Sequence, residues 1–270
     1  MDIPTLFGIC YDAQSSYLRG AANAPSAIRE AFRCSASNSW TETGIDLGPP
    51  GIFADAGDLL IEEKDPFASI EAGVAALLGR SARPVLLGGD HSITFPIVKA
   101  FATKYSGLTV FHFDAHPDLY DEFEGNRFSH ACPFARIMES GMAKRLVQIG
   151  IRTINRHQRE QAGKFGVEVV EMNALPAYRK LKEAGPIYVS FDMDVLDPAF
   201  APGVSHREPG GMSVREAIAH LHAIEGSIVG ADIVEYNPAQ DVAGVTATVA
   251  AKILKELLGK MLTSEPRASK

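Results

Sequence analysis

Residues 84–92 read Pro84-Val85-Leu86-Leu87-Gly88-Gly89-Asp90-His91-Ser92. The first four are apolar without polar alternation, which is typical of a strand buried on both faces of a parallel sheet. The glycine pair allows a close backbone approach that a side chain would prevent, so that His91 can turn back over the strand end. Asp90 or Ser92 can also cap a helix that begins there. An apolar strand that runs into such a turn predicts a binding crevice at the carboxyl edge of a parallel sheet.

The alternation of strand and helix continues along the whole chain. Strand-forming runs occur at 6–10, 53–55, 85–87, 108–113, 146–151, 167–170, 187–191 and 227–234. Segments with helical period occur at 24–32, 67–78, 93–105, 134–140, 156–164, 175–183, 214–224 and 245–262. We therefore predict an α/β fold in which a mainly parallel sheet of eight strands carries helices on both faces.

Composition limits the class of protein. The chain has 270 residues, 46% of them hydrophobic and 22% charged, with a net charge of -7 at pH 7. A chain of this size commonly forms one domain, so we expect a single domain over residues 1–270, with 263–270 a frayed tail. The absence of a basic run predicts no nucleic-acid partner. No apolar run approaches membrane-spanning length, so we expect no membrane partner.

Two features bear on the compartment. Cys10, Cys34 and Cys132 form neither a paired framework nor a Cys-x-x-Cys motif, which indicates reduced thiols. The first residues enter an apolar strand without a basic region, a secretory apolar core or an Arg/Ser-rich transit segment. From both observations we predict a cytoplasmic protein.

Two further apolar runs lead into acidic residues and histidine. They read Phe113-Asp114-Ala115-His116-Pro117-Asp118 and Ser190-Phe191-Asp192-Met193-Asp194. Alternation along an extended segment puts residues i, i+2 and i+4 on one side, so each cluster can direct its side chains at one point. Taken singly, each residue has a structural alternative as a turn, cap or packed side chain. Together they give six candidate metal ligands, which suit two ions better than one: His91, Asp114, His116, Asp118, Asp192 and Asp194.

This ligand set indicates a class of reaction. Carboxylate and imidazole without cysteine favour a hard or borderline ion, manganese first, with iron, cobalt, nickel and zinc left open. Two ions about 3.5 to 4 Å apart can hold a water as hydroxide against an electrophilic carbon, which is metal-assisted hydrolysis. His130 and Glu235 follow in the sequence as a candidate proton donor and a candidate cation-binding group.

Four blocks in this order resemble the arginase and agmatinase family, the manganese-dependent ureohydrolases. The blocks are Gly-Gly-Asp-His-Ser at 88–92, Asp-Ala-His-x-Asp at 114–118, Ser-Phe-Asp-x-Asp-x-x-Asp-Pro at 190–198, and the glutamate at 235 before Asn-Pro. The resemblance covers nearly the whole chain and is strongest to plant-type arginases, through 129–139, 150–155 and 197–211. It implies a three-layer α/β/α sandwich with an eight-stranded sheet, and a homotrimer or homohexamer.

The resemblance also implies roles for single residues. Two Mn²⁺ ions would be held by His91, Asp114, Asp118 and Asp192, and by His116, Asp114, Asp192 and Asp194. Asp118 would also accept a proton, His130 would shuttle one, and Glu235 would hold a guanidinium through paired charge-assisted hydrogen bonds. Asp90 and Asp197 are interpreted as structural groups. The implied reaction is hydrolysis of a linear guanidino compound, agmatine or L-arginine, to urea and putrescine or ornithine.

The resemblance is weaker at the residues that would select the far end of the substrate. The loop 119–127 lacks the Asn and Ser/Thr pattern of animal arginases, and Asn155 stands where those enzymes place an aspartate. Asn126 or Arg127 could bind a carboxylate, and His206 is a further candidate. Guanidinobutyrate and formiminoglutamate remain alternative substrates. A non-catalytic metal-binding homologue is a third alternative, against which the presence of both His130 and Glu235 argues.

Overall fold

The computed structural model describes residues 2–177 and 181–264. Its strands form one sheet in the order β2-β1-β3-β8-β7-β4-β5-β6, and neighbouring strands pair in parallel. The strands are β1 (Ile3–Gly8), β2 (Ala54–Asp58), β3 (Ala82–Leu87), β4 (Thr109–Phe113), β5 (Arg145–Ile151), β6 (Glu168–Glu171), β7 (Lys182–Asp192) and β8 (Glu225–Val234). The predicted eight-stranded parallel sheet is confirmed.

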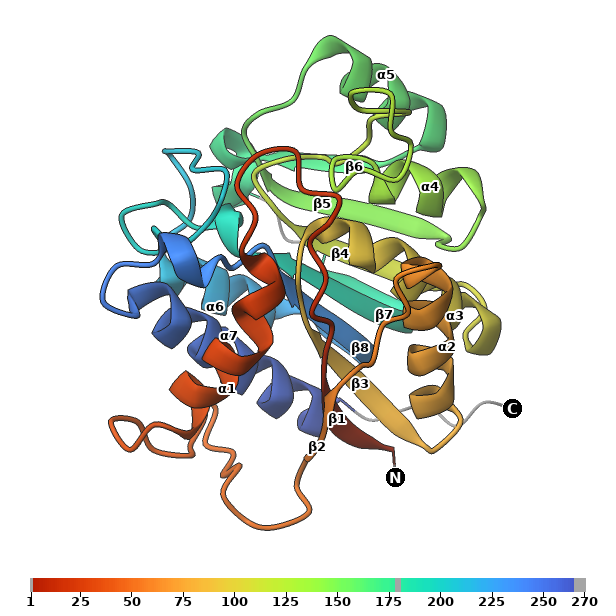
Figure 1. Ribbon diagram of the computed structural model, residues 1–270. Coiled ribbons are helices and arrows are strands. Elements are labelled where there is room, and N and C mark those ends of the chain that lie inside the picture. The colour runs from red at the N-terminus through yellow and green to blue at the C-terminus, as the bar shows by residue number, and fades with distance from the viewer. Residues whose placement is uncertain (1, 178–180, 265–270) are drawn as a thin grey trace.

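Helices cover both faces of this sheet (Figure 1). One face carries α1 (Ala24–Arg33), α6 (Val214–Ala223) and α7 (Val245–Thr263), and the other carries α2 (Pro66–Leu78), α3 (Thr94–Lys104), α4 (Pro133–Glu139) and α5 (Arg156–Phe165). Short 3-10 turns are η1 (Ala21–Asn23), η2 (His91–Ile93), η3 (Met172–Ala177), η4 (Met193–Val195) and η5 (Pro238–Gln240). Each helical layer encloses its own apolar core against the sheet, so the three-layer α/β/α sandwich is confirmed.

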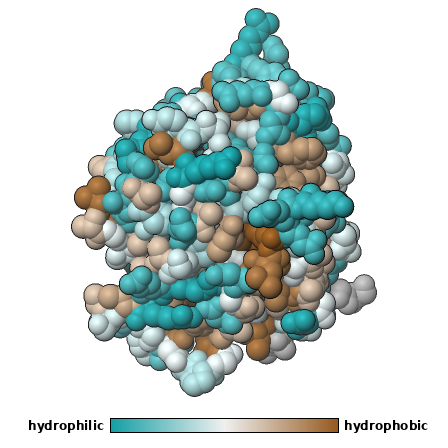
Figure 2. All heavy atoms as spheres, viewed as in Figure 1, coloured by the Kyte–Doolittle hydropathy of each residue, from teal (hydrophilic) through white to brown (hydrophobic). Residues whose placement is uncertain are grey.

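Burial along the strands follows their place in the sheet. Every residue of β3 is buried, because this strand has neighbours on both edges and helices on both faces. Every residue of the edge strand β2 is exposed. Most of the face seen in Figure 2 is polar, with apolar side chains in small separate groups. The buried apolar residues form the two cores, one on each side of the sheet.

The main error of the sequence prediction is the helix at 175–183. The chain instead forms η3, and β7 has begun by Lys182, while residues 178–180 lie outside the described part. Lys182 pairs with Glu225 at the start of β8, so strand pairing overrides a short helical pattern. Of the predicted frayed tail, Thr263 still belongs to α7, and 265–270 lie outside the described residues.

Within residues 2–177 and 181–264, no helix has both the length and the apolar character needed to cross a membrane. The cysteines Cys10, Cys34 and Cys132 are all unpaired, as predicted.

Candidate metal centre and its cavity

The candidate ligands meet at the carboxyl ends of β3, β4 and β7, beside the end of β8. These are the four central strands, in the order β3-β8-β7-β4. After β3 come the glycine pair and Asp90, and His91 then begins η2. Asp192 is the last residue of β7, and Asp194 lies in η4. The glycine pair is required for close packing, since a Cβ at Gly89 would come within 1.6 Å of the Tyr11 carbonyl oxygen. The predicted crevice therefore lies where the sequence placed it.

The side chains of residues 114–118 come together because the backbone turns, and not because they alternate along an extended strand. β4 ends at Phe113, and the chain then bends so that the His116 amide donates to Asp114 Oδ1 at 2.6 Å. Asp118 adopts a left-handed backbone with φ 49°, a conformation that costs energy for a residue with a side chain. The expectation of one extended face is therefore wrong for this segment, although its side chains do meet.

The first ligand group surrounds one nitrogen atom. His91 Nδ1 lies 3.1 Å from a carboxylate oxygen of each of Asp114, Asp118 and Asp192. This nitrogen is buried and has no hydrogen-bond partner, while Nε2 of the same ring lies 2.9 Å from Ser190 Oγ. Three carboxylates cannot share the single proton of one nitrogen, so the arrangement is that of a cation site.

The second ligand group lies beside the first and shares Asp114. His116 Nδ1 is 3.0 Å from Asp194 Oδ2 and 3.4 Å from Asp114 Oδ1. One ligand atom of each of these three residues lies within 4.8 Å of the other two. The two oxygens of Asp114 therefore face different groups, Oδ2 toward His91 and Oδ1 toward His116.

The pKa shifts within the cluster also favour a bound cation. Burial, together with the carboxylates of Asp194 and Asp114, raises the pKa of Asp192 well above its usual value. Burial disfavours the charged form of His91, yet the surrounding carboxylates raise its pKa well above the usual range. Without a cation the cluster is therefore stabilised by taking up protons, which is the behaviour expected of a site for positive charge. Carboxylate and imidazole donors without sulfur fit a hard or borderline divalent ion.

His130 and Glu235 form a buried pair at the edge of the cluster. His130 Nδ1 lies 2.9 Å from Glu235 Oε1, which also accepts from the His91 backbone N–H at 2.9 Å. Burial disfavours a charged His130, but the Glu235 carboxylate outweighs this and the pKa of His130 rises to about 9. Burial is likewise outweighed at Glu235, whose pKa is lowered by His130. Near neutral pH the pair is therefore an ion pair, with His130 protonated and Glu235 ionised.

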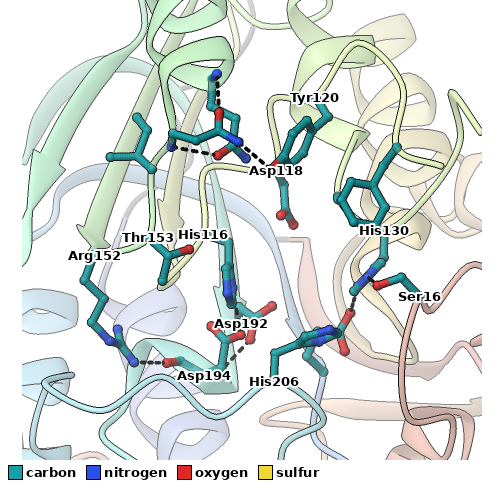
Figure 3. A pocket seen from close by; sticks show the side chains of 16 residues that line it. Ser16, His116, Asp118, Tyr120, His130, Arg152, Thr153, Asp192, Asp194 and His206 are labelled. Atoms are coloured by element: carbon teal, nitrogen blue, oxygen red, sulfur yellow. Dashed lines mark hydrogen bonds and ion pairs between the residues drawn. The ribbon is translucent and has the colours of Figure 1, made fainter.

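A cavity of about 500 Å³ opens above the ligands (Figure 3). Its walls include most of the predicted site residues: His116, Asp118, His130, Asn155, Asp192, Asp194, His206 and Glu235. His91 and Asp114 are fully buried and do not line it. The ligands thus form the floor of a space large enough for a small molecule.

Two predicted substrate-binding residues are not brought to the cavity. Arg127 is instead paired with Asp121 at 2.8 Å and with Glu139 at 3.0 Å, on the surface. Asn126 donates to Gln14 Oε1 at 2.7 Å. Neither residue lines the cavity, so the interpretation of Asn126 and Arg127 as contacts to a substrate carboxylate is corrected. Closeness in sequence to Asp118 was misleading, because the loop carries both side chains away.

Two further predicted residues, Asn155 and His206, line the cavity, and two predicted structural groups, Asp90 and Asp197, bind backbone amides. Asn155 caps α5 through Gln158 and donates to the Tyr120 hydroxyl at 2.6 Å, while it also lines the cavity. His206 faces His130 with ring centroids 5.2 Å apart, and burial lowers its pKa. The Asp90 carboxylate accepts from the Gln14 and Ser92 backbone amides, as expected of a structural group. Asp197 accepts from the amides of Gly210, Gly211 and Ala199 in the same manner.

Several cavity residues carry no sequence signal of their own. Ser16 Oγ lies 2.8 Å from His130 Nε2, and Arg152 donates to the backbone oxygens of Asp194 and Glu208 at 2.6 Å. Tyr120 and Thr153 complete this wall. Ser16 is more than a hundred residues from His130 in sequence, so only the folded chain reveals the contact.

Curated proteins with similar sequences include arginases and agmatinases. A curated protein named "Arginase, mitochondrial" from Medicago truncatula is 47% identical over 275 residues, spanning 95% of this chain and 81% of the relative. A curated agmatinase from Bacillus subtilis (strain 168) is 34% identical over 270 residues, spanning 94% of this chain and 90% of the relative. These relatives are hydrolases that cleave C–N bonds of guanidino compounds, and the present chain is a hydrolase of the same type.

The relatives also correct the predicted compartment. Matching plant arginases carry the word mitochondrial in their names. This contradicts the prediction of a cytoplasmic protein. Unpaired cysteines do not distinguish one reducing compartment from another.

The fold and the family agree. The solved structure of arginase from Medicago truncatula superposes with a TM-score of 0.90 at 46% identity, covering 96% of this chain and 87% of that chain. Residues 4–259 match the sequence pattern of the arginase family, which includes every residue of the candidate metal centre. On these grounds, the chain belongs to the arginase family.

Proposed function

We propose that the protein is a binuclear manganese ureohydrolase, which hydrolyses a linear guanidino compound to urea and an amine. The observation that carries the proposal is the meeting of three carboxylates at 3.1 Å around the unpartnered His91 Nδ1, next to the His116 and Asp194 pair. The cavity above this cluster brings His130 and Glu235 to the same space.

Six residues would hold the metal. One Mn²⁺ would be bound by His91, Asp114, Asp118 and Asp192, and the other by His116, Asp114, Asp192 and Asp194. The donor set fits manganese because it is rich in carboxylate and lacks sulfur. When bound, two such ions lower the pKa of water so that hydroxide is available as a nucleophile near neutral pH.

The remaining chemistry belongs to side chains around the cavity. Glu235 is buried, anionic and open to the cavity, so it can pair with a guanidinium. The C–N bond that breaks leaves an amine that needs a proton. His130 is charged near neutral pH and sits beside Glu235, so it is placed to supply that proton. Asp118 lines the same cavity and can accept the proton of the attacking water.

The names of the relatives support L-arginine first and agmatine second as substrates. The curated arginase from Medicago truncatula shares 47% of aligned residues, against 34% for the agmatinase from Bacillus subtilis. Asn155 and His206 line the cavity apart from the ligand set and are proposed to contact the far end of the substrate. Guanidinobutyrate and formiminoglutamate would need the same metal centre and a different far end.

Urea release from Mn-loaded protein tests this function directly. L-arginine, agmatine and guanidinobutyrate should be compared by urea release, and formiminoglutamate by formamide release, at equal concentrations, with Glu235→Gln protein as the matched control. We expect one guanidino substrate to exceed the others by at least about tenfold, in line with the worth of a hydrogen bond to a charged group. Absence of urea with every guanidino substrate would overturn the proposal, and turnover of formiminoglutamate alone would replace it.

Two proposals concern the protein as a whole. We propose that residues 1–270 act as one catalytic domain, and that the protein assembles as a homotrimer or homohexamer. Light scattering of the purified protein measures the mass of the assembly. A monomeric mass with full activity would contradict the second of these proposals.

A further inference from the structure

Four buried polar side chains form a row across the sheet beneath the candidate metal centre. They are Gln148 on β5, His112 on β4, Ser190 on β7 and Asp232 on β8, each with no exposed surface. His112 is the register partner of both Gln148 and Ser190, and Ser190 is the partner of Asp232. Partners in parallel strands point to the same face, so the four side chains lie side by side. Burial of such groups costs free energy unless they are hydrogen-bonded. All four make side-chain hydrogen bonds, although Gln148 Oε1 has no partner.

The half of the row on β7 and β8 orients His91. Ser190 Oγ donates to Asp232 Oδ1 at 2.7 Å, because a carboxylate only accepts. Ser190 therefore accepts from Nε2–H of His91 at 2.9 Å. In the neutral ring, Nδ1 of His91 therefore carries no proton and faces the three carboxylates.

The hydrogen bonds in the half of the row on β4 and β5 also have a defined direction from donor to acceptor. The Gln148 side-chain nitrogen faces the Pro117 carbonyl, which can only accept, so the amide orientation is fixed. The same nitrogen lies 3.1 Å from His112 Nδ1, which must accept. The proton of neutral His112 is therefore on Nε2, which donates to Asp114 Oδ2 at 2.7 Å.

We propose that His112 and Gln148 are positioning residues for the metal centre, a buried relay that holds the Asp114 carboxylate in its bridging orientation. The inference rests on the proposed function, because it takes Asp114 as a ligand of both ions. His112 fixes one oxygen of Asp114, and Gln148 fixes both the tautomer of His112 and the carbonyl of Pro117. The relay therefore ties the segment 114–118 to the neighbouring strand at two points.

Packing around His112 limits its alternatives. Its ring stacks on Phe134 with centroids 3.8 Å apart at 28°, and meets the edge of the His91 ring at 4.9 Å. A ring held in this way cannot turn to present Nδ1 to Asp114 without displacing both neighbours. The hydrogen bond to Asp114 is thus set by the polar row and by close packing together.

The first test is spectroscopic and needs no turnover. Protein labelled with nitrogen-15 at histidine should show the His112 ring, assigned by its loss in His112→Phe, in the Nε2–H tautomer. In Gln148→Leu this ring should lose its single tautomer, because Nδ1 no longer has a donor. An Nδ1–H tautomer for His112 in the wild type would overturn the relay.

The second test is the affinity of metal-free protein for Mn²⁺, measured by calorimetry. His112→Phe keeps the ring stack but removes the donor, and we expect affinity to fall about 10- to 100-fold, the range typical of groups that orient metal ligands. His112→Gln can still present an N–H toward Asp114 and should recover most of that loss. Phe111→Leu is the matched control: it alters packing one residue away on the opposite face of β4 and should leave Mn²⁺ affinity unchanged.

The outcomes separate this inference from the proposed function. If the wild type binds no pair of Mn²⁺ ions, the proposed function fails, while the tautomer of His112 still tests the relay. If the wild type binds two ions and His112→Phe binds them equally well, the relay fails and the proposed function stands. Equal losses of affinity in His112→Phe and Phe111→Leu would reduce His112 to a packing residue.

Discussion

His130 Nδ1 lies 2.9 Å from Glu235 Oε1, and this contact joins the two side chains proposed to handle charge in the reaction. Glu235 stabilises the proton on His130 against burial, so the pKa of His130 is about 9. A guanidinium that pairs with Glu235 competes for the same negative charge. Binding of the substrate cation would therefore weaken the hold on the His130 proton, at the stage when the departing amine needs one.

Glu235→Gln should show this coupling. The change keeps the shape of the side chain but removes its charge, so the pKa of His130 should fall from about 9 toward its usual value. Loss of a charge-assisted hydrogen bond of about 1.5 to 3 kcal/mol predicts a kcat/KM about tenfold to a hundredfold lower, with both metals retained. Titration of the His130 ring by NMR and steady-state kinetics measure the two effects. Unchanged kinetics would leave Glu235 a structural carboxylate.

Metal content should be about two Mn²⁺ per chain, because Asp114 directs one oxygen to each ligand group. His91→Ala removes a contact of the first group only, and Asp194→Ala one of the second only. Each variant should keep close to one ion, measured by elemental analysis after gel filtration. One tightly bound zinc ion per chain, with activity indifferent to manganese, would contradict this assignment.

Removal of metal should lower stability. Without a cation the carboxylates of Asp192 and Asp194 are unfavourable, because burial and neighbouring carboxylates raise the pKa of each. Binding of Mn²⁺ to the folded chain alone adds about 2.7 kcal/mol per site at a hundredfold excess over Kd. The unfolding midpoint should therefore rise with Mn²⁺ concentration, and this increase should be smaller in Asp194→Ala. A midpoint independent of Mn²⁺ would exclude a ligand site at this cluster.

The sequence was most informative where pattern and geometry coincide. Buried strands such as β3 read as apolar runs, and the residues after them lie at the carboxyl edge because parallel strands all end there. The turn at Asp118 was not predictable, since its left-handed backbone is imposed by surrounding contacts. His112 and Gln148 carried a weak signal, as polar residues inside otherwise apolar strands. Their connection to each other depends on strand register, which the sequence alone does not specify.

Arg127→Ala tests the corrected view of the substrate's far end. Arg127 is paired with Asp121 and Glu139 at the surface and does not line the cavity, so the change should leave kcat/KM for L-arginine and agmatine alike unaltered. Exposed ion pairs contribute at most about 1 kcal/mol to stability, so folding should change little. Asn155→Ala is the comparison, because Asn155 does line the cavity and should change the ratio of the two substrates. A selective loss with L-arginine in Arg127→Ala would restore the original interpretation.

Ser16→Ala tests the outer partner of His130. The Ser16 hydroxyl lies 2.8 Å from His130 Nε2, on the side of the ring away from Glu235, and Ser16 is exposed at the cavity wall (Figure 3). A charged His130 donates through Nε2 to this hydroxyl, which in turn can contact solvent, so the serine connects the buried ring to bulk water.

Loss of that hydroxyl should leave Mn²⁺ content and KM close to wild type, because neither the ligands nor Glu235 is touched. We expect kcat to fall by about tenfold, the low end of the range for a positioned proton-transfer group, with Ser16→Thr close to wild type. The solvent deuterium isotope effect on kcat should increase in Ser16→Ala, since proton delivery would then limit the rate. If kcat and the isotope effect both stay at wild-type values, water replaces the hydroxyl and Ser16 only lines the wall.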